Sequence, residues 1–277
     1  MKELWSRKDE EALKGFLEAV HAEDLQEALL AFESAPERIR TADEALLAHW
    51  ADRVKQRRGG VEGTSLEEAR DLAAVLGAQL GFSGDADDYY DPRNCLLHDV
   101  LERRRGMPIL LSVVWMEVGR RAGIAVEGVG MPGHFIVRVG AADGVLADPF
   151  AGGAILTVEE CRRKVRELAG GRLPWKAAFL AASPAAAILE RILHNLAGCY
   201  GRAGDEGGRF RAVSFLSALR PDEPDNLLTR AEIADGAGAR ELALGIYTEI
   251  LERFPESSQA QAASEKISGT ELPPTVN

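Results

Sequence analysis

The longest apolar stretch of the chain predicts a buried central helix. Between residues 107 and 118, only three positions interrupt the apolar run: Pro108, Ser112 and Glu117. A helix that is apolar on nearly all sides belongs inside a core rather than on a surface. Proline is well tolerated in a first helical turn, and Gly123 after two arginines is typical of a helix end. We therefore predict one buried helix over Met107–Arg121 that begins at Pro108.

Three short segments after this helix predict strands. Ala125–Gly130 and His134–Val139 are rich in β-branched residues and are bounded by glycine and proline. The segment Gly140–Asp143 is typical of a turn. Val145–Asp148 is therefore expected to return as the antiparallel partner of the second strand.

A short turn near Ala141–Ala142 would bring two polar residues together. It would place His134 opposite Asp148 or one position away, with Cβ atoms about 5 Å apart. An aspartate at that distance can accept a hydrogen bond from the imidazole Nδ1–H and fix the orientation of the ring. His134 and Asp148 are thus either a retained polar pair of a catalytic site or a structural pair that holds the hairpin.

The remaining pattern is helical. Thr64 or Ser65, together with Glu67 or Glu68, offers the chemistry of a capping box for a helix that runs to about Leu80. Further helices are expected over Asn94–Arg105 and Val158–Leu168, because their apolar residues recur at helical spacing.

The C-terminal part shows an internal repeat. Pro221 and Pro255 are 34 residues apart, which is the tetratricopeptide period. Apolar positions recur at the same offset, as in the pairs Leu193 and Leu227 or Leu216 and Ile250. We predict tetratricopeptide-like helical hairpins, with one helix pair over Leu227–Gly236 and Arg240–Phe254 and a capping helix over Ser257–Ile267.

Composition narrows the possible partners and the compartment. A net charge of −11 disfavours nucleic acid and anionic membranes as general partners. No segment approaches the ~20 apolar residues of a membrane span, and no apolar signal segment precedes the first helix. Three widely spaced cysteines suggest neither a disulfide framework nor a zinc site, and no other metal or cofactor is expected. The cytoplasm is the expected location.

Four spaced motifs resemble a known family. They are Tyr90-Asp-Pro-Arg-Asn94, Leu101-Glu-Arg-Arg-Arg-Gly-Met-Pro-Ile109, Pro132-Gly-His-Phe135 and Asp148-Pro-Phe-Ala-Gly-Gly153. In this order they resemble the SirB-type transglutaminase-like family, whose parent fold carries a papain-like Cys-His-Asp site. The resemblance covers roughly Leu66 to the C-terminus. It implies a buried helix packed against a small antiparallel sheet.

These observations predict an α+β protein in four parts. The parts are an N-terminal helical region (1–64), a papain- or transglutaminase-like core (65–183), tetratricopeptide-like α-hairpin repeats (184–268) and a disordered tail (269–277).

The resemblance also implies that the usual nucleophile is missing. The parent pattern places Gly-x-Cys at the start of the core helix, and Gly106-Met107-Pro108 stands there. Proline has no nucleophilic atom, so His134 and Asp148 would have nothing adjacent to activate. Cys95 is a candidate for a displaced nucleophile, although a small residue packed near a helix start is the simpler interpretation. Ser112 is expected to hydrogen-bond to the preceding helical turn.

Two hypotheses for the function follow. The first is a non-catalytic binding or scaffold protein that engages a polypeptide or another subunit through a degenerate cleft and its helical repeats. The second is a papain-like cysteine peptidase, amidase or acyl transferase that uses His134, Asp148 and Cys95. In either case the cleft is expected to be lined by four residues: Asn94, Pro108, Ser112 and Gly133. His98 and His194 are interpreted as structural histidines without partners, and the oligomeric state stays open.

Overall fold

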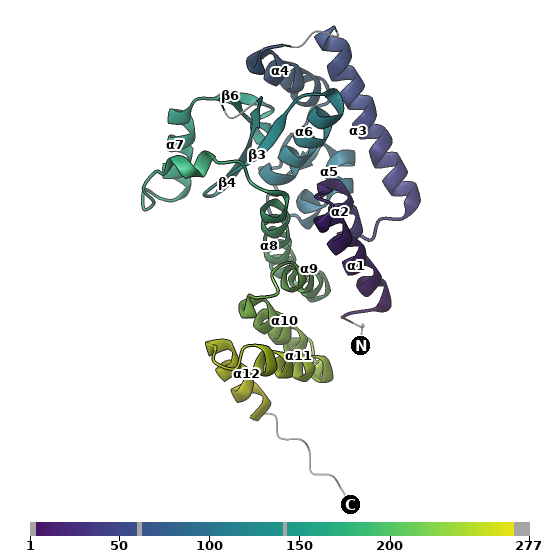
Figure 1. The fold of residues 1–277 in the computed structure, drawn as a ribbon, viewed down its shortest axis with the longest axis vertical. Coiled ribbons are helices and arrows are strands. Elements are labelled where there is room, and N and C mark those ends of the chain that lie inside the picture. Colours follow the sequence, from purple (N-terminus) through teal and green to yellow (C-terminus); the bar gives the residue numbers. More distant parts are fainter. Residues whose placement is uncertain (1–3, 60–62, 141–142, 269–277) are drawn as a thin grey trace, which may run out of the picture. The chain divides into compact units, whose positions relative to one another are not determined.

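The computed structural model describes residues 4–59, 63–140 and 143–268 (Figure 1). The chain forms two compact units. One comprises Glu18–Ile192, and the other combines Met1–Leu17 with Leu193–Asn277. This grouping differs from the four predicted parts, whose boundaries stay predictions, and the predicted tail 269–277 lies outside the described residues. Within the described part of the chain, no helix is long and apolar enough to cross a membrane.

The predicted central helix is confirmed as α6, Pro108–Ala122. It begins at Pro108 and ends before Gly123, whose φ of 74° is the left-handed conformation that glycine adopts without strain. Val114 is fully buried and Trp115 is 1% exposed. The apolar pattern therefore identified the helix at the centre of the larger unit.

A four-stranded antiparallel sheet follows α6, in the order β3-β4-β5-β6. Its strands are β3 (Val126–Met131), β4 (His134–Val139), β5 (Val145–Asp148) and β6 (Ala154–Leu156). The three predicted strands are present, and β6 is an addition. The predicted register is wrong by two positions, because Ile136 rather than His134 is in line with Asp148 when the pairing of Val137 with Ala147 is extended. A shift of two residues keeps both side chains on the same face.

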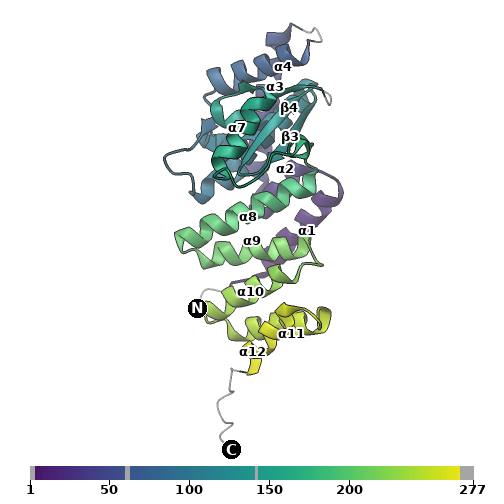
Figure 2. The same cartoon turned by 90° about the vertical axis from the view of Figure 1, so that its left-hand side faces the viewer.

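The two faces of this sheet are covered by different helices. On one face, Val129, Ile136 and Leu146 pack in a cluster with Cys161 and Val165 of α7, Val158–Leu168. The other face meets α6, because a Cβ at Gly119 of α6 would lie 2.4 Å from Val126 of β3. Helix α3, Glu37–Arg58, contacts α6 in turn. Figure 1 shows α7 and α6 on opposite sides of the strands, and Figure 2 shows α7 beside β3 and β4.

The segment before α6 differs from the single helix expected over 94–105. It contains a 3-10 turn (Pro92–Cys95), helix α5 (Leu97–Arg103) and a short strand β2 (Arg105–Gly106) that pairs with β1 (Ser83–Gly84). Leu96 is extended, with φ −105° and ψ 127°, and it separates the turn from the helix. The predicted capping box of Thr64 and Glu67 is confirmed at the start of α4, Ser65–Leu72, which continues as a π-helix over Ala73–Gln79.

The remaining helices of the larger unit are at its N-terminal end. They are α2, Leu25–Phe32, and the part of α1, Arg7–His21, that follows Leu17; at its C-terminal end the unit also includes the first part of α8, Ala185–Ala203, up to Ile192.

The other unit is built of helices. They are the first part of α1, the part of α8 (Ala185–Ala203) from Leu193 onward, α9 (Glu206–Leu219), α10 (Pro224–Gly236), α11 (Arg240–Arg253) and α12 (Ser258–Ser268). Their core contains Phe210, Leu227, Tyr247 and Ile250, and Trp5 packs against it. The predicted helix pair is present as α10 and α11, whereas its assignment as a tetratricopeptide repeat stays a prediction.

Candidate functional site

His134 and Asp148 form a buried hydrogen-bonded pair. His134 opens β4 and Asp148 ends β5, and the distance from His134 Nε2 to Asp148 Oδ2 is 2.9 Å. The expected contact through Nδ1 is therefore corrected to Nε2. The two-residue offset in register explains how the longer imidazole side chain reaches a diagonal neighbour on the same face.

Asp148 also accepts from two further donors. The Lys164 ammonium of α7 lies 3.1 Å from the same oxygen, Oδ2, and the backbone N–H of Phe150 donates to Oδ1 at 3.1 Å. Burial opposes ionisation of this carboxyl, but the hydrogen bond from His134 and the Lys164 charge outweigh it, so the pKa of Asp148 lies below its usual value. Asp148 is thus held as a carboxylate.

The sequence reasoning missed Lys164. The signal was present, because Thr157 and Glu160 form a capping box that fixes the start of α7. Residues 161 and 164 then lie on the same helical face. Cys161 is fully buried there, and burial together with the nearby Asp148 charge raises the pKa of its thiol to about 11. A thiol with that pKa stays protonated at neutral pH and is a poor nucleophile.

Aromatic rings and a turn surround the imidazole. Phe150 meets the His134 ring edge-on at 6.0 Å between centroids, and Tyr89 meets Phe150 at 6.1 Å. Gly133, in the turn before His134, has a φ of 76°, and a Cβ there would lie 3.1 Å from Leu168 of α7. Of the four residues predicted to line the cleft, Gly133 is therefore the one next to His134.

The other predicted lining residues lie at the start of α6. Ser112 donates its hydroxyl to the carbonyl of Pro108 at 2.8 Å, as expected for a hydroxyl within a helix. His134 and Asp148 lie on the face of the sheet that α7 covers, whereas Pro108 and Ser112 belong to the helix on the opposite face. The expectation that the pair points at the start of α6 stays a prediction.

Cys95 lies beside the start of α6 as well. Its thiol is fully buried, 3.1 Å from the sulfur of Met107, the residue that precedes Pro108. Met107 donates its backbone N–H to the carbonyl of Asn94 at 2.9 Å. Whether Cys95 acts as a displaced nucleophile stays a prediction.

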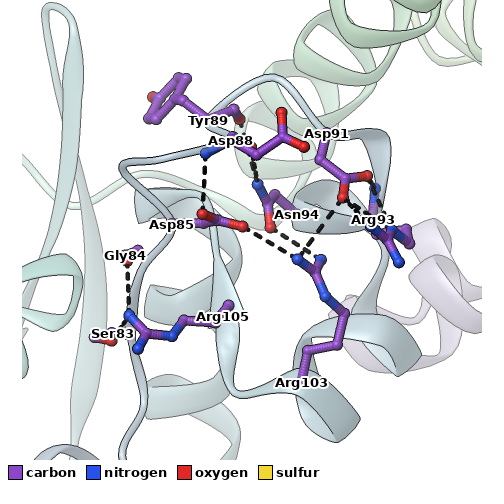
Figure 3. A network of polar contacts seen from close by, with 10 residues as sticks. All are labelled: Ser83, Gly84, Asp85, Asp88, Tyr89, Asp91, Arg93, Asn94, Arg103 and Arg105. Carbon is purple, nitrogen blue, oxygen red and sulfur yellow. Dashed lines mark hydrogen bonds and ion pairs between the residues drawn. The ribbon is translucent and has the colours of Figure 1, made fainter.

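Asn94 organises a polar network around the loop that precedes it (Figure 3). Its amide donates to the carbonyl of Asp88 at 2.7 Å, and its Oδ1 accepts from Arg103 at 3.1 Å. Arg103 also donates to Asp85 at 3.1 Å, and Arg93 pairs with Asp91. This network fixes the loop whose Tyr89 contacts Phe150.

His98 has a partner, contrary to the sequence interpretation. Its Nδ1 lies 2.9 Å from Oδ1 of Asp43, a fully buried residue of α3. Glu33 accepts from the backbone N–H groups of Leu97 and His98. Burial, only partly offset by these hydrogen bonds, raises the pKa of Glu33 to about 7.

Two further features of the described residues bear on ligands. A pocket of about 840 Å³ lies among α2, α3 and the end of α6, and Gln26, Glu44 and Arg121 line it. None of the predicted site residues borders this pocket. Within the described ranges, no three histidine, cysteine, aspartate or glutamate side chains are grouped so that they could hold a metal ion.

Comparisons with known proteins agree with the sequence motifs. Residues 42–194, just over half of the chain, match the model of the transglutaminase-like superfamily. A UPF0162 protein of Xylella fastidiosa is 40% identical over 211 residues, which are 74% of this chain and 75% of that protein. A UPF0162 protein of Pseudomonas aeruginosa is 38% identical over 155 residues, 56% of each chain.

A eukaryotic protein is similar to part of the chain. F-box only protein 21 of Mus musculus is 32% identical over 171 residues, which are 57% of this chain and 26% of that protein. No solved structure matches the chain significantly. The extent of these matches shows that the chain belongs to the transglutaminase-like superfamily and, within it, to the UPF0162 family of SirB-like proteins.

Proposed function

We propose that this protein is a non-catalytic member of its superfamily that binds a polypeptide or protein partner around His134. The observation that carries the proposal is the proline that stands at the start of α6, where the parent pattern has its nucleophile. The residue at the start of α6 is Pro108, and His134 and Asp148 are on the other face of the sheet. A general base must lie within hydrogen-bond reach of the nucleophile that it activates.

The surroundings of His134 suit binding. The rim combines a cation at Lys164 with apolar and aromatic groups at Leu168 and Phe150. Leu168 and Tyr90 expose 57% and 51% of their surfaces. Exposed apolar side chains beside fixed polar groups are typical of sites that recognise another chain. The helical hairpins of the other unit would add a second contact surface.

A papain-like cysteine enzyme remains the second candidate. It is favoured by one observation, the position of the Cys95 thiol beside Met107 at the start of α6. A thiol at a helix start gains nucleophilic character from the helix dipole. This candidate requires a proton acceptor within hydrogen-bond reach of the Cys95 thiol.

Selection from a peptide library tests the binding proposal. The full chain, immobilised, is offered a displayed library of random peptides, and the enriched peptides are synthesised and titrated. We expect His134→Ala and Leu168→Asp to weaken binding, because both change the proposed surface, and Cys95→Ala to leave it unchanged. His98→Ala is the matched control, since His98 pairs with Asp43 instead. Peptides that bind all variants equally would contradict the proposed surface.

A further inference from the structure

Asp148 is a shared acceptor between a cation and an imidazole. Lys164 Nζ and His134 Nε2 both meet Oδ2, at 3.1 and 2.9 Å, and the carboxylate is fully buried. A buried carboxylate is stable only when donors or opposite charge compensate it. Lys164 supplies the full positive charge, so the imidazole need not supply one.

This arrangement determines the chemistry of the other ring nitrogen. Because Nε2 donates its proton to Asp148, Nδ1 of the uncharged ring carries a lone pair and can only accept. Among the described residues, none hydrogen-bonds to Nδ1. One tenth of the His134 side chain is exposed.

We propose that Lys164 is a positioning residue that acts through Asp148 and keeps His134 as an uncharged hydrogen-bond acceptor at Nδ1. The ligand of this site is then an amide N–H that lies next to an apolar side chain. The inference rests on the proposed function and names the chemical class of its ligand. A polypeptide backbone supplies such donors, and the apolar rim at Leu168 and Phe150 would receive the adjacent side chain.

The other charged and titratable groups around the ring are few. Helix α7 contributes Lys164, the protonated thiol of Cys161 and the partly exposed Glu160. From α8, Arg191 donates to the backbone carbonyl of His134 at 3.0 Å. Tyr89 contacts Phe150, and its charge acts on Arg191. Lys164 is therefore the cation that shares the carboxylate with the imidazole.

Removal of Lys164 should change the ring from acceptor to donor. With Asp148 uncompensated, the imidazole would take up a proton at Nδ1. One unit charge a few Å away changes that equilibrium by about fivefold or more. The site would then favour an acceptor such as a carboxylate. Lys164→Arg retains the charge and should retain the wild-type behaviour.

The test is NMR on the full chain with ¹⁵N-labelled histidine, at one fixed pH near 7.5. The wild type and Lys164→Arg should show a bare Nδ1 and a protonated Nε2. Lys164→Met should show a ratio of Nδ1-protonated to bare ring that is about fivefold higher. Far-ultraviolet circular dichroism verifies folding, and Lys164→Gln replaces the Met variant if that variant is unfolded.

The same samples are titrated with two probes that differ at one group, N-acetyl-leucine methylamide and N-acetyl-leucine. We expect the wild type to bind the methylamide more tightly than the carboxylate. In Lys164→Met, the ratio of these two affinities should fall about fivefold. A wild-type Nδ1 that carries a proton, or a Met variant identical to wild type, would overturn the role of Lys164. Binding of neither probe, or preference for the carboxylate, would overturn the ligand class. The peptide selection tests whether a polypeptide binds around His134 at all, whereas the ring protonation and the choice between the two probes test how it would be recognised, so the two proposals can fail separately.

Discussion

Asn94 and Arg103 form a side-chain hydrogen bond of 3.1 Å that joins the turn before α5 to the last residue of that helix. Asn94 is fully buried, and its amide also fixes the carbonyl of Asp88 at 2.7 Å. The loop that carries Tyr89 toward Phe150 is therefore anchored from within the larger unit (Figure 3).

Asn94→Ala should be strongly destabilising. It removes the fully buried amide that bonds the Arg103 guanidinium and the Asp88 carbonyl; a hydrogen bond to a charged group contributes about 1.5–3 kcal/mol and an uncharged one about 1 kcal/mol. We expect the free energy of unfolding in urea to fall by about 2 kcal/mol or more. The control is Arg105→Ala, because Arg105 is exposed and bonds only at the loop surface. A loss below 0.5 kcal/mol, roughly the scatter of surface substitutions, would contradict the anchoring role.

Replacing buried side chains of the central helix α6 by alanine should lower the stability of the fold more than the same replacement at the surface. Val114→Ala and Trp115→Ala remove side chains that are at most 1% exposed. Large-to-small changes in a core cost about 2–5 kcal/mol, with the larger loss expected for tryptophan. Val158→Ala, at a half-exposed site on α7, is the control. Thermal unfolding at the wild-type temperature for both core variants would show that α6 is not central.

Stability should depend on pH through Glu33. Its pKa is about 7 in the folded protein against 4.5 for a free glutamate, so the folded state binds the proton more tightly than the unfolded chain. The resulting stabilisation is complete below pH 4.5 and is lost as the pH rises to about 7. The loss amounts to about 3 kcal/mol. The pKa values of His98 and Asp43 are also raised, so both act in the same direction.

Glu33→Gln should flatten this dependence. The amide oxygen can still accept from the N–H groups of Leu97 and His98, but it carries no charge to bury. The measurement is the free energy of unfolding in urea between pH 5 and about 7.5 for wild type, Glu33→Gln and the exposed control Glu37→Gln. Equal slopes in all three proteins would contradict the assignment to Glu33.

The sequence predicted the elements better than their contacts. The apolar run of α6 and the alternation of β4 and β5 were sufficient to locate them, because burial imposes those periods. The register depends on the turn between Val139 and Val145, which alternation does not specify. The packing of α7 on the face that carries His134 also has no local signature.

Pairs that are distant in sequence were missed for the same reason. Asp43 and His98 are 55 residues apart, and Lys164 reaches Asp148 from a separate helix. Their side chains meet only through tertiary packing. The pair of His134 and Asp148 was predicted correctly because both belong to neighbouring strands of one sheet.

The central claim is that the site is non-catalytic, and one labelling experiment tests it most directly. Purified wild-type, Cys95→Ala and His134→Ala proteins are incubated with a thiol-directed electrophile and with amide and ester substrates. The account predicts no turnover in any of them, and any labelling of Cys95 should be slow and independent of His134, because the thiol is buried against Met107. Rapid labelling of Cys95 that requires His134, or hydrolysis abolished by either substitution, would contradict the account and establish a displaced Cys-His-Asp site.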